Sequence, residues 1–370
     1  MKKVLFLIHD LGRGGAEKVL INLVNHMDRS QFDITVMALF AGGVNEPFLA
    51  KDIRYITCFK KAIPGNSHLM KLLSPRALHK WLIKDHYDIE ISYLEGPSAR
   101  IISGCPNLDT KLISWVHSIQ RDLKTLSKSY RSIKEARTCC DRFDQTICVS
   151  QYMKADFCSV LDFKKPCDVL YNTVDSEMIQ ALSSESVCDF PKKETINLIA
   201  VGTLKEVKGY ERLLRVISRL VQDGLKIHLY ILGKGPLEQD LKAQIRELAI
   251  QANVTLLGYH TNPYKYVAKC DLFVCSSYSE GFSTATTESL IVGTPVCTVE
   301  VSGMKEMLGE NNEYGIVTEN SEEALYQGIK QFFDNPELLN NYKQKALERG
   351  KMFSTQKTVA AVEEMLKGIL

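Results

Sequence analysis

The sequence predicts an α/β protein made of two doubly wound domains, each with a largely parallel sheet. Apolar runs with strand character alternate with amphipathic helix patterns along the whole chain, which is typical of parallel sheets connected by helices. The 370 residues exceed what one hydrophobic core usually organises. The alternation also begins anew after a polar stretch at 183–193, so we place the boundary between the domains there.

The first domain, residues 1–182, is expected to begin with a buried strand. The opening MKKVLFLIHD resembles the start of a signal peptide, but its apolar run is short and ends at His9 and Asp10. We therefore interpret Val4 to Ile8 as a strand, followed by a helix from Gly14 to His26. Further strands are predicted at 32–40, 89–93, 111–116, 145–149 and 168–170, with a helix between the last two.

The second domain, residues 194–353, repeats this pattern. Strands are predicted at 196–201, 226–232, 254–257, 272–275 and 296–299, and helices at 210–222, 236–252, 321–333 and 336–353. A last helix pattern runs over about 356–370. No stretch reaches the roughly 18 apolar residues that are needed to span a bilayer.

The composition is that of an ordinary globular protein. A net charge of +2 gives no indication of nucleic-acid binding, and we expect none. The 11 cysteines include no pair with CxxC spacing, so we interpret them as the reduced thiols of a cytoplasmic protein. We accordingly expect no metal site and no cofactor.

Two glutamates eight positions apart, Glu280 and Glu288, are the most informative pair in the sequence. The first lies in a loop after the strand at 272–275, and the second lies inside the helix that follows. Ligands of open α/β sheets bind at such carboxyl ends of strands. Main-chain N–H groups near Ser283 to Ala285 can hold a phosphate, whereas the carboxylates would repel it and suit sugar hydroxyls. The arrangement therefore suggests a sugar nucleotide.

Two further turns fall at the same predicted edge of the second sheet. Gly202 to Gly209 follows a strand and opens a helix, which places Lys208 within reach of a phosphate. Gly233-Lys234-Gly235-Pro236 follows the next strand. Taken singly, such a lysine is usually a solvated charge and such a glycine pair only a turn.

The first domain offers a glycine-rich turn and a histidine. The turn from His9 to Glu17 resembles a dinucleotide fingerprint, but its spacing differs from GxGxxG and no acid ends the second strand. We weigh NAD binding and a plain turn below a turn that approaches a ligand held by the other domain. His117 follows a strand end and could hydrogen-bond a sugar hydroxyl or lie near the reacting centre.

Two segments, 68–84 and 119–142, are both basic and amphipathic. Each could bind an anionic membrane surface or simply pack its apolar stripe on its own domain. We leave both interpretations open. If either segment binds lipid, the protein would be peripheral on the inner face of the cell membrane.

Together these residues resemble the retaining glycosyltransferases of family 4, which have the GT-B fold, and the similarity covers nearly the whole chain. Its most specific part is Glu280 through Glu288, followed by Gly293-Thr294-Pro295-Val296, which is similar to the family's EX7E motif. The other matching segments follow in the family's order: Gly14-Gly15-Ala16-Glu17, Val149-Ser150, Asn172-Thr173-Val174-Asp175, Lys208-Gly209 and Gly233-Lys234-Gly235-Pro236.

The resemblance implies two Rossmann-like domains that face across a cleft, with residues 354–370 packing back on the first. It implies that Glu280 faces the donor sugar, that Glu288 binds the ribose hydroxyls and that Lys208 neutralises the diphosphate. Gly15 would approach the phosphates and His117 would touch the transferred sugar. Further donor contacts are expected from Gly14, Thr203, Lys205, Gly233, Gly281, Phe282, Ser283 and Thr284.

The chain departs from the family pattern at two positions. Thr203 stands where many members have an arginine that binds phosphate. Lys205 could substitute for it from the same loop, or the helix start could carry more of the charge. Asn172-Thr173 replaces the commoner Asn-Gly.

The implied reaction moves a hexosyl unit from a nucleoside diphosphate sugar, with uracil as the base on family grounds, to a saccharide or lipid-linked acceptor. We expect retention at the anomeric carbon, no metal, and a place in bacterial envelope polysaccharide synthesis. The alternatives are a GT-B sugar-nucleotide epimerase and a non-catalytic protein that binds nucleotide sugars.

Overall fold

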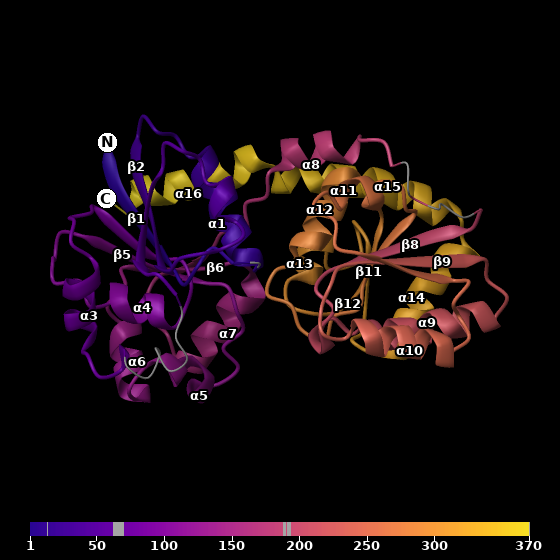
Figure 1. Cartoon of the computed structure of the whole chain (residues 1–370), viewed down its shortest axis with the longest axis horizontal. Helices are drawn as coiled ribbons and strands as arrows, with labels where there is room; N and C mark the ends of the chain where they lie inside the picture. Colours follow the sequence, from indigo (N-terminus) through magenta and orange to yellow (C-terminus); the bar gives the residue numbers. More distant parts are fainter. Residues whose placement is uncertain (13, 62–69, 188–189, 191–193, 370) are drawn as a thin grey trace. The chain divides into compact units, whose positions relative to one another are not determined.

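The computed structural model describes residues 1–12, 14–61, 70–187, 190 and 194–369. The chain divides into two compact units. The first comprises Met1–Val174 and Thr355–Leu370, and the second comprises Asp175–Ser354. Each unit has one parallel sheet with helices on both of its faces (Figure 1). The predicted fold class is therefore confirmed.

The first unit has a seven-stranded sheet in the order β3-β2-β1-β4-β5-β6-β7. Its strands are β1 (Lys2–Ile8), β2 (Phe32–Phe40), β3 (Arg54–Phe59), β4 (Ile89–Ser92), β5 (Lys111–Val116), β6 (Gln145–Cys148) and β7 (Cys167–Val169). Val4 to Ile8 are completely buried, because β1 pairs on both sides and helices cover both faces. A central parallel strand is apolar along its length for this reason.

Helices of the first unit include α1 (Gly15–His26), α3 (Pro75–Leu82), α4 (Pro97–Ile102), α7 (Gln151–Leu161) and α16 (Thr355–Gly368). The last of these returns from the second unit to pack on α1. The Thr355 hydroxyl donates to the Val174 carbonyl at 2.9 Å, and Glu363 accepts from the main-chain N–H of Asp28 at 2.6 Å.

The second unit has a six-stranded sheet in the order β10-β9-β8-β11-β12-β13. Its strands are β8 (Ile196–Val201), β9 (Ile227–Leu232), β10 (Val254–Gly258), β11 (Leu272–Cys275), β12 (Val296–Val299) and β13 (Ile316–Thr318). Figure 1 shows α9 (Tyr210–Gln222), α10 (Glu238–Glu247) and α14 (Glu322–Asp334) on one face. The other face carries α11 (Tyr264–Val267), α12 (Thr284–Val292) and α15 (Glu337–Gly350).

Both sheets reverse their strand order at one place, between β1 and β4 in the first and between β8 and β11 in the second. At each of these places, the connections that follow the two neighbouring strands go to opposite faces of the sheet. The loops at the carboxyl ends of these strands therefore separate and leave room for a ligand. The loops after β8 and β11 contain Lys208 and Glu280.

The boundary between the units lies earlier than predicted. Helix α8 (Ser176–Ser183) packs on α11 and α12 of the second unit, and Asn262 donates to the Leu182 carbonyl at 2.9 Å. The N-terminal segment of the first unit therefore ends at Val174 rather than at residue 182. The predicted linker at 183–193 follows this helix, and 188–189 and 191–193 fall outside the described residues.

The prediction of one amphipathic stripe over 119–142 is wrong. Arg121 has a φ of 57°, which interrupts a helix. Asp122 then caps a short helix, α5 (Leu123–Leu126), and Ser132 caps another, α6 (Ile133–Cys140). Of the segment 68–84, residues 68–69 lie outside the described part, and α3 forms most of the rest. Among the described residues, no helix is long and apolar enough to cross a membrane.

Candidate functional site

The centre of the site is an ion pair between loops that leave β8 and β11. Lys208 Nζ lies 2.7 Å from Glu280 Oε1, and the Ser277 hydroxyl donates to the same oxygen at 2.5 Å. Only 27% of the Lys208 side chain and 12% of the Glu280 side chain are exposed. The structure thus brings together two of the three residues for which the sequence predicted catalytic roles, the third being His117.

Gly209 allows the two loops to meet. Its φ of 61° is left-handed, and a Cβ at this position would lie 2.2 Å from the Ser276 carbonyl oxygen. The Ser276 hydroxyl donates to the Lys208 carbonyl at 2.9 Å, and the Tyr278 N–H donates to the Val207 carbonyl at 2.8 Å. A glycine is therefore required beside Lys208 for a structural reason.

Arg212, on α9, hydrogen-bonds the loop after β11, and it was not among the residues predicted from the sequence. Its side chain is buried and donates to the Ser276 and Ser277 carbonyls, each at 2.8 Å. It also donates to Asn320 at 2.7 Å and lies over the Tyr278 ring. An arginine at helical spacing in an otherwise apolar stripe was the available signal.

Helix α12 begins beside this pair, as predicted. Ser283 is its N-cap, and the Ser283 hydroxyl accepts from the main-chain N–H of Thr286 at 3.3 Å. Thr284 is the first residue of the helix, so its first-turn N–H groups carry the positive end of the helix dipole. The Phe282 ring instead packs on Phe353, with centroids 6.0 Å apart, so its predicted donor contact would come from its main chain.

Glu288 lies in the second turn of α12 and is buried, with 9% exposed. The hydroxyl of Tyr264, on α11, donates to Glu288 Oε1 at 3.3 Å. Tyr264 is a second residue that the sequence reasoning missed, since a tyrosine in a short helix gives no motif. It orients the carboxylate for which we predicted ribose binding.

Close packing explains why the turn after β9 contains glycine. A Cβ at Gly233 would lie 1.8 Å from the Gly202 carbonyl oxygen, so the turn after β9 packs directly on the turn after β8. Thr203 and Lys205 lie in the turn after β8, and both are exposed. The structure gives Gly233 a packing role and leaves its predicted donor contact untested.

A small pocket lies at the carboxyl ends of β8 and β11, at the place where the strand order reverses. Lys208, Glu280, Ser283 and Ala285 line it, together with Ser276 and Ser277. It therefore combines a cation, a carboxylate and the N-terminus of α12. These are groups that bind a phosphate and hydroxyls.

In the glycine-rich turn of the first unit, the adjacent residues Gly14 and Gly15 have different surroundings. A Cβ at Gly14 would meet the Glu17 carboxylate, a movable group, whereas a Cβ at Gly15 would meet nothing within 4 Å of the described chain. Gly15 is exposed and is the first residue of α1. Packing thus gives no reason for glycine at this position.

His117 follows β5, as predicted, and its ring packs on Tyr93 with centroids 4.8 Å apart. Burial lowers the pKa of His117 to about 3, so the imidazole is neutral at physiological pH. In the described part of the chain, its Nε2 is buried and has no hydrogen-bond partner. Glu95, which follows β4, accepts the His117 main-chain N–H at 3.0 Å.

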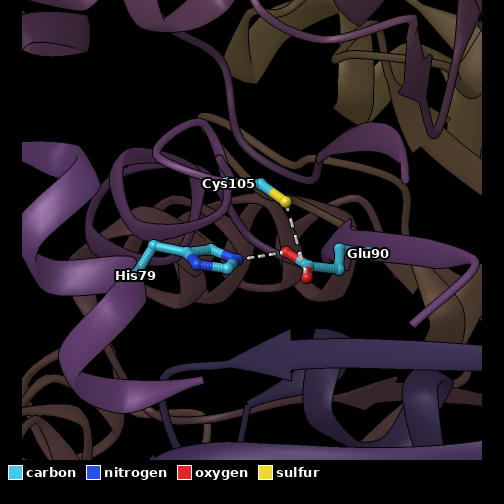
Figure 2. Close-up of side chains that lie close together, drawn as sticks. All are labelled: His79, Glu90 and Cys105. Atoms are coloured by element: carbon cyan, nitrogen blue, oxygen red, sulfur yellow. Dashed lines mark hydrogen bonds and ion pairs between the residues drawn. The ribbon is translucent and has the colours of Figure 1, made fainter. Parts of the chain in front are cut away.

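One buried cluster of the first unit contains residue types that bind metals, and no sequence motif indicated it. Figure 2 shows His79 from α3 and Cys105, beyond α4, both pointing at the carboxylate of Glu90 on β4. His79 Nε2 lies 2.7 Å from Glu90, and the Cys105 thiol donates to it at 3.7 Å. Two ligands of a tetrahedral zinc lie about 3.3 Å apart, so the shorter distance fits a shared proton.

The contacts in this cluster favour the charged form of His79. Burial opposes protonation of His79, but the contacts with Cys105 and Glu90 raise its pKa to about 9. The pair ties α3 to the sheet inside an apolar core that includes Leu78 and Ile83.

Comparison with known proteins agrees with the geometry. Residues 13–178 match the family model Glycosyltransferase Family 4, and residues 189–349 match the model Glycosyl transferases group 1. The chain is 30% identical, over the full length of both chains, to a Campylobacter jejuni protein. That protein is named N-acetylgalactosamine-N,N'-diacetylbacillosaminyl-diphospho-undecaprenol 4-alpha-N-acetylgalactosaminyltransferase. This chain is also 24% identical to the lipopolysaccharide 1,6-galactosyltransferase of Escherichia coli, covering 80% of this chain and 79% of that one.

Solved structures show the same fold. The Anabaena protein Alr3699/HepE in complex with UDP and glucose superimposes with a TM-score of 0.78, at 19% identity, over 99% of this chain and all of that one. The galactosyltransferase WaaB superimposes with a TM-score of 0.77 at 18% identity, over the full length of both chains.

Two parallel-sheet Rossmann-like units of seven and six strands define a protein of the GT-B type. The Campylobacter and Escherichia coli relatives are both named as glycosyltransferases. The chain belongs to glycosyltransferase family 4.

Proposed function

We propose that this protein is a retaining, metal-independent hexosyltransferase that uses a UDP-sugar. The observation that carries the proposal is the Lys208–Glu280 pair beside the start of α12, in the pocket where the second sheet reverses its strand order. The Anabaena structure of the same fold, which holds UDP and glucose, supports the choice of donor.

In this mechanism, the bond between the anomeric carbon and the diphosphate oxygen breaks, and negative charge collects on the leaving group. Lys208 and the first N–H groups of α12 stabilise that charge without reorganising. The acceptor oxygen attacks from the same face, and its proton passes to the leaving phosphate. Glu280 orients the sugar rather than attacking it, since it is already held by Lys208 and Ser277. Glu288 binds the ribose hydroxyls.

Substitution of the ion pair tests this assignment. Lys208→Ala is expected to lower kcat by about 10²–10³-fold, the usual cost of losing one group that stabilises developing charge. Lys234→Ala, on the neighbouring turn, is the matched control, and it should transfer sugar at the rate of the unmodified chain. Turnover is followed as UDP release with purified donor and acceptor. Unchanged turnover in Lys208→Ala would remove this residue from the site.

Metal independence rests on the same groups. The sequence contains no DxD motif to hold a metal-bound diphosphate, and a cation and helix N-terminus line the pocket instead. Full activity is expected in excess chelator. A loss of activity that Mg²⁺ restores would contradict this part of the proposal.

We further propose that the acceptor is lipid-linked. The Campylobacter relative is named for a diphospho-undecaprenol substrate. In the first unit, the carbonyls of 70–73 accept from two arginines: Arg100 binds those of Met70 and Leu73, and Arg131 binds those of Lys71 and Leu72. The loop held in this way leaves Leu72 75% exposed beside basic residues, which suits the surface of an anionic bilayer.

Liposome binding tests the lipid surface. Replacing Lys71 and Leu72 together by Ser should reduce flotation with anionic vesicles and leave binding to neutral vesicles unchanged. An exposed apolar residue elsewhere, Leu108, provides the control as Leu108→Ser. Undiminished flotation of the double variant would show that this loop is ordinary surface.

Two other functions would give different experimental results. An epimerase would convert the donor sugar without an acceptor, so incubation with UDP-sugar alone would produce a second sugar nucleotide. A non-catalytic binding protein, for which Thr203 in place of arginine gives slight support, would bind UDP tightly and turn over no donor.

A further inference from the structure

We infer that Glu95 is a positioning residue of the first unit, which fixes the segment 117–120 so that the His117 imidazole can meet a substrate hydroxyl. This inference rests on the proposed glycosyl transfer. No sequence motif singled out Glu95.

Glu95 and His117 lie just beyond the carboxyl ends of two neighbouring strands. Glu95 follows β4, at the place where the first sheet reverses its strand order, and His117 follows β5. Gly96, with a φ of 83°, turns the chain directly after Glu95 into α4. The carboxylate therefore lies at the sheet edge where a ligand is expected.

Among the described residues, the Glu95 carboxylate has donors as its hydrogen-bond partners. Oε2 accepts from the His117 main-chain N–H at 3.0 Å. Oε1 accepts from the Ser118 hydroxyl and, at 3.4 Å, from the Gln120 amide. A carboxylate suits three donors because it offers acceptors only. Asp156, on α7, holds the same segment from the other side through the Gln120 N–H at 2.7 Å.

The segment that is fixed in this way carries the His117 ring. His117 packs on Tyr93 and on Trp115, and its Nε2 has no hydrogen-bond partner among the described residues. An unpaired buried nitrogen costs about 1–3 kcal/mol, and a ligand hydroxyl can supply the missing bond. That bond requires the imidazole to stay in place, and Glu95 helps to fix the main chain that carries it.

The kinetic test is a double-mutant cycle with His117. Glu95→Ala is expected to lower kcat about tenfold or more, with little change in KM for the donor. The double variant with His117→Ala should be no slower than His117→Ala alone, because Glu95 acts through His117. Asp52→Ala, an exposed carboxylate of the same unit, is the control. Effects that multiply would overturn the inference.

A second arm is independent of transfer. The ring signals of His117 are assigned by nuclear magnetic resonance from their loss in His117→Ala, among the eight histidines. In the unmodified chain the ring stays neutral until about pH 3. In Glu95→Ala, its pKa should rise toward the ordinary value as the segment loosens, and Glu95→Gln should restore part of the shift. An unmoved signal overturns the positioning role, whereas a wild type without transfer activity overturns only the proposed function.

Discussion

At the residue scale, the neighbours of a glycine distinguish a packing role from a ligand role. A Cβ at Gly209 or Gly233 would strike a carbonyl oxygen within the second unit, so the fold itself requires these glycines. Gly15 has no such neighbour in the described chain. We propose that glycine there lets a ligand approach the main chain closely, as the resemblance predicts for a phosphate.

Gly15→Ala tests this explanation. The substitution should leave the free energy of unfolding unchanged or raise it by up to about 1 kcal/mol, because alanine is favoured over glycine in a helix. It should nevertheless lower kcat/KM for the donor about tenfold or more, since an added methyl displaces the phosphates. Urea unfolding and steady-state kinetics measure the two effects. Gly368→Ala, equally open in α16, is the control, and full activity of Gly15→Ala would refute the ligand role.

At the element scale, the interior strands were predictable, whereas two of the four edge strands, β3 and β13, were missed. The strands 32–40, 111–116 and 196–201 have the predicted bounds, because buried parallel strands read as continuous apolar runs. Strand β3 was missed because it pairs only with β2 and is nowhere fully buried. The break at 119–142 had a local signal, since Ser132 and Glu135 form the S-x-x-E pattern of a helix start.

The candidate site divides in a similar way. Lys208, Glu280 and Glu288 were predictable because sequence spacing and strand ends place them. Arg212, Tyr264 and Glu95 were not, since each is defined by partners far along the chain. A prediction from one sequence finds groups at strand ends and helix starts more readily than the groups that hold them in place.

Helix α9 supports the site through Arg212. Arg212→Met leaves the Ser276 and Ser277 carbonyls without their donor, and we expect a loss of roughly 3 kcal/mol in the free energy of unfolding. UDP binding, measured by calorimetry, should weaken as the loop loosens. The control is Arg219→Met on the same helix. The ion pair between Arg219 and Glu323 is exposed, so little change is expected in either measurement. Equal effects of the two substitutions would contradict the bracing role.

The tie between α3 and β4 predicts a pH dependence. The pKa of His79 rises from 6.5 to about 9 on folding, so the folded state binds the extra proton. The resulting stabilisation, at most about 3 kcal/mol, is complete below pH 6.5 and is lost as the pH rises through 9. Urea unfolding of His79→Gln and the unmodified chain should therefore converge at high pH. A difference that stays constant with pH would show that His79 is not charged.

At the scale of the whole molecule, the first unit is completed by residues from the end of the chain. Helix α16 buries Val359, Val362 and Leu366 in it, and each such side chain contributes about 1.5–3 kcal/mol. The second unit, Asp175–Ser354, is continuous in sequence and includes none of them. The stability of the two units should therefore be separable by substitutions in α16.

Leu366→Ala should destabilise the first unit by about 2–5 kcal/mol through the cavity it leaves. Both tryptophans, Trp81 and Trp115, lie in this unit, so tryptophan fluorescence follows its unfolding alone, whereas circular dichroism follows both units. The fluorescence transition should shift to lower urea in Leu366→Ala, and the remaining dichroism transition should stay in place. Glu364→Ala, on the exposed face of the same helix, should shift neither. Transitions that shift together would mean that the two units unfold as one.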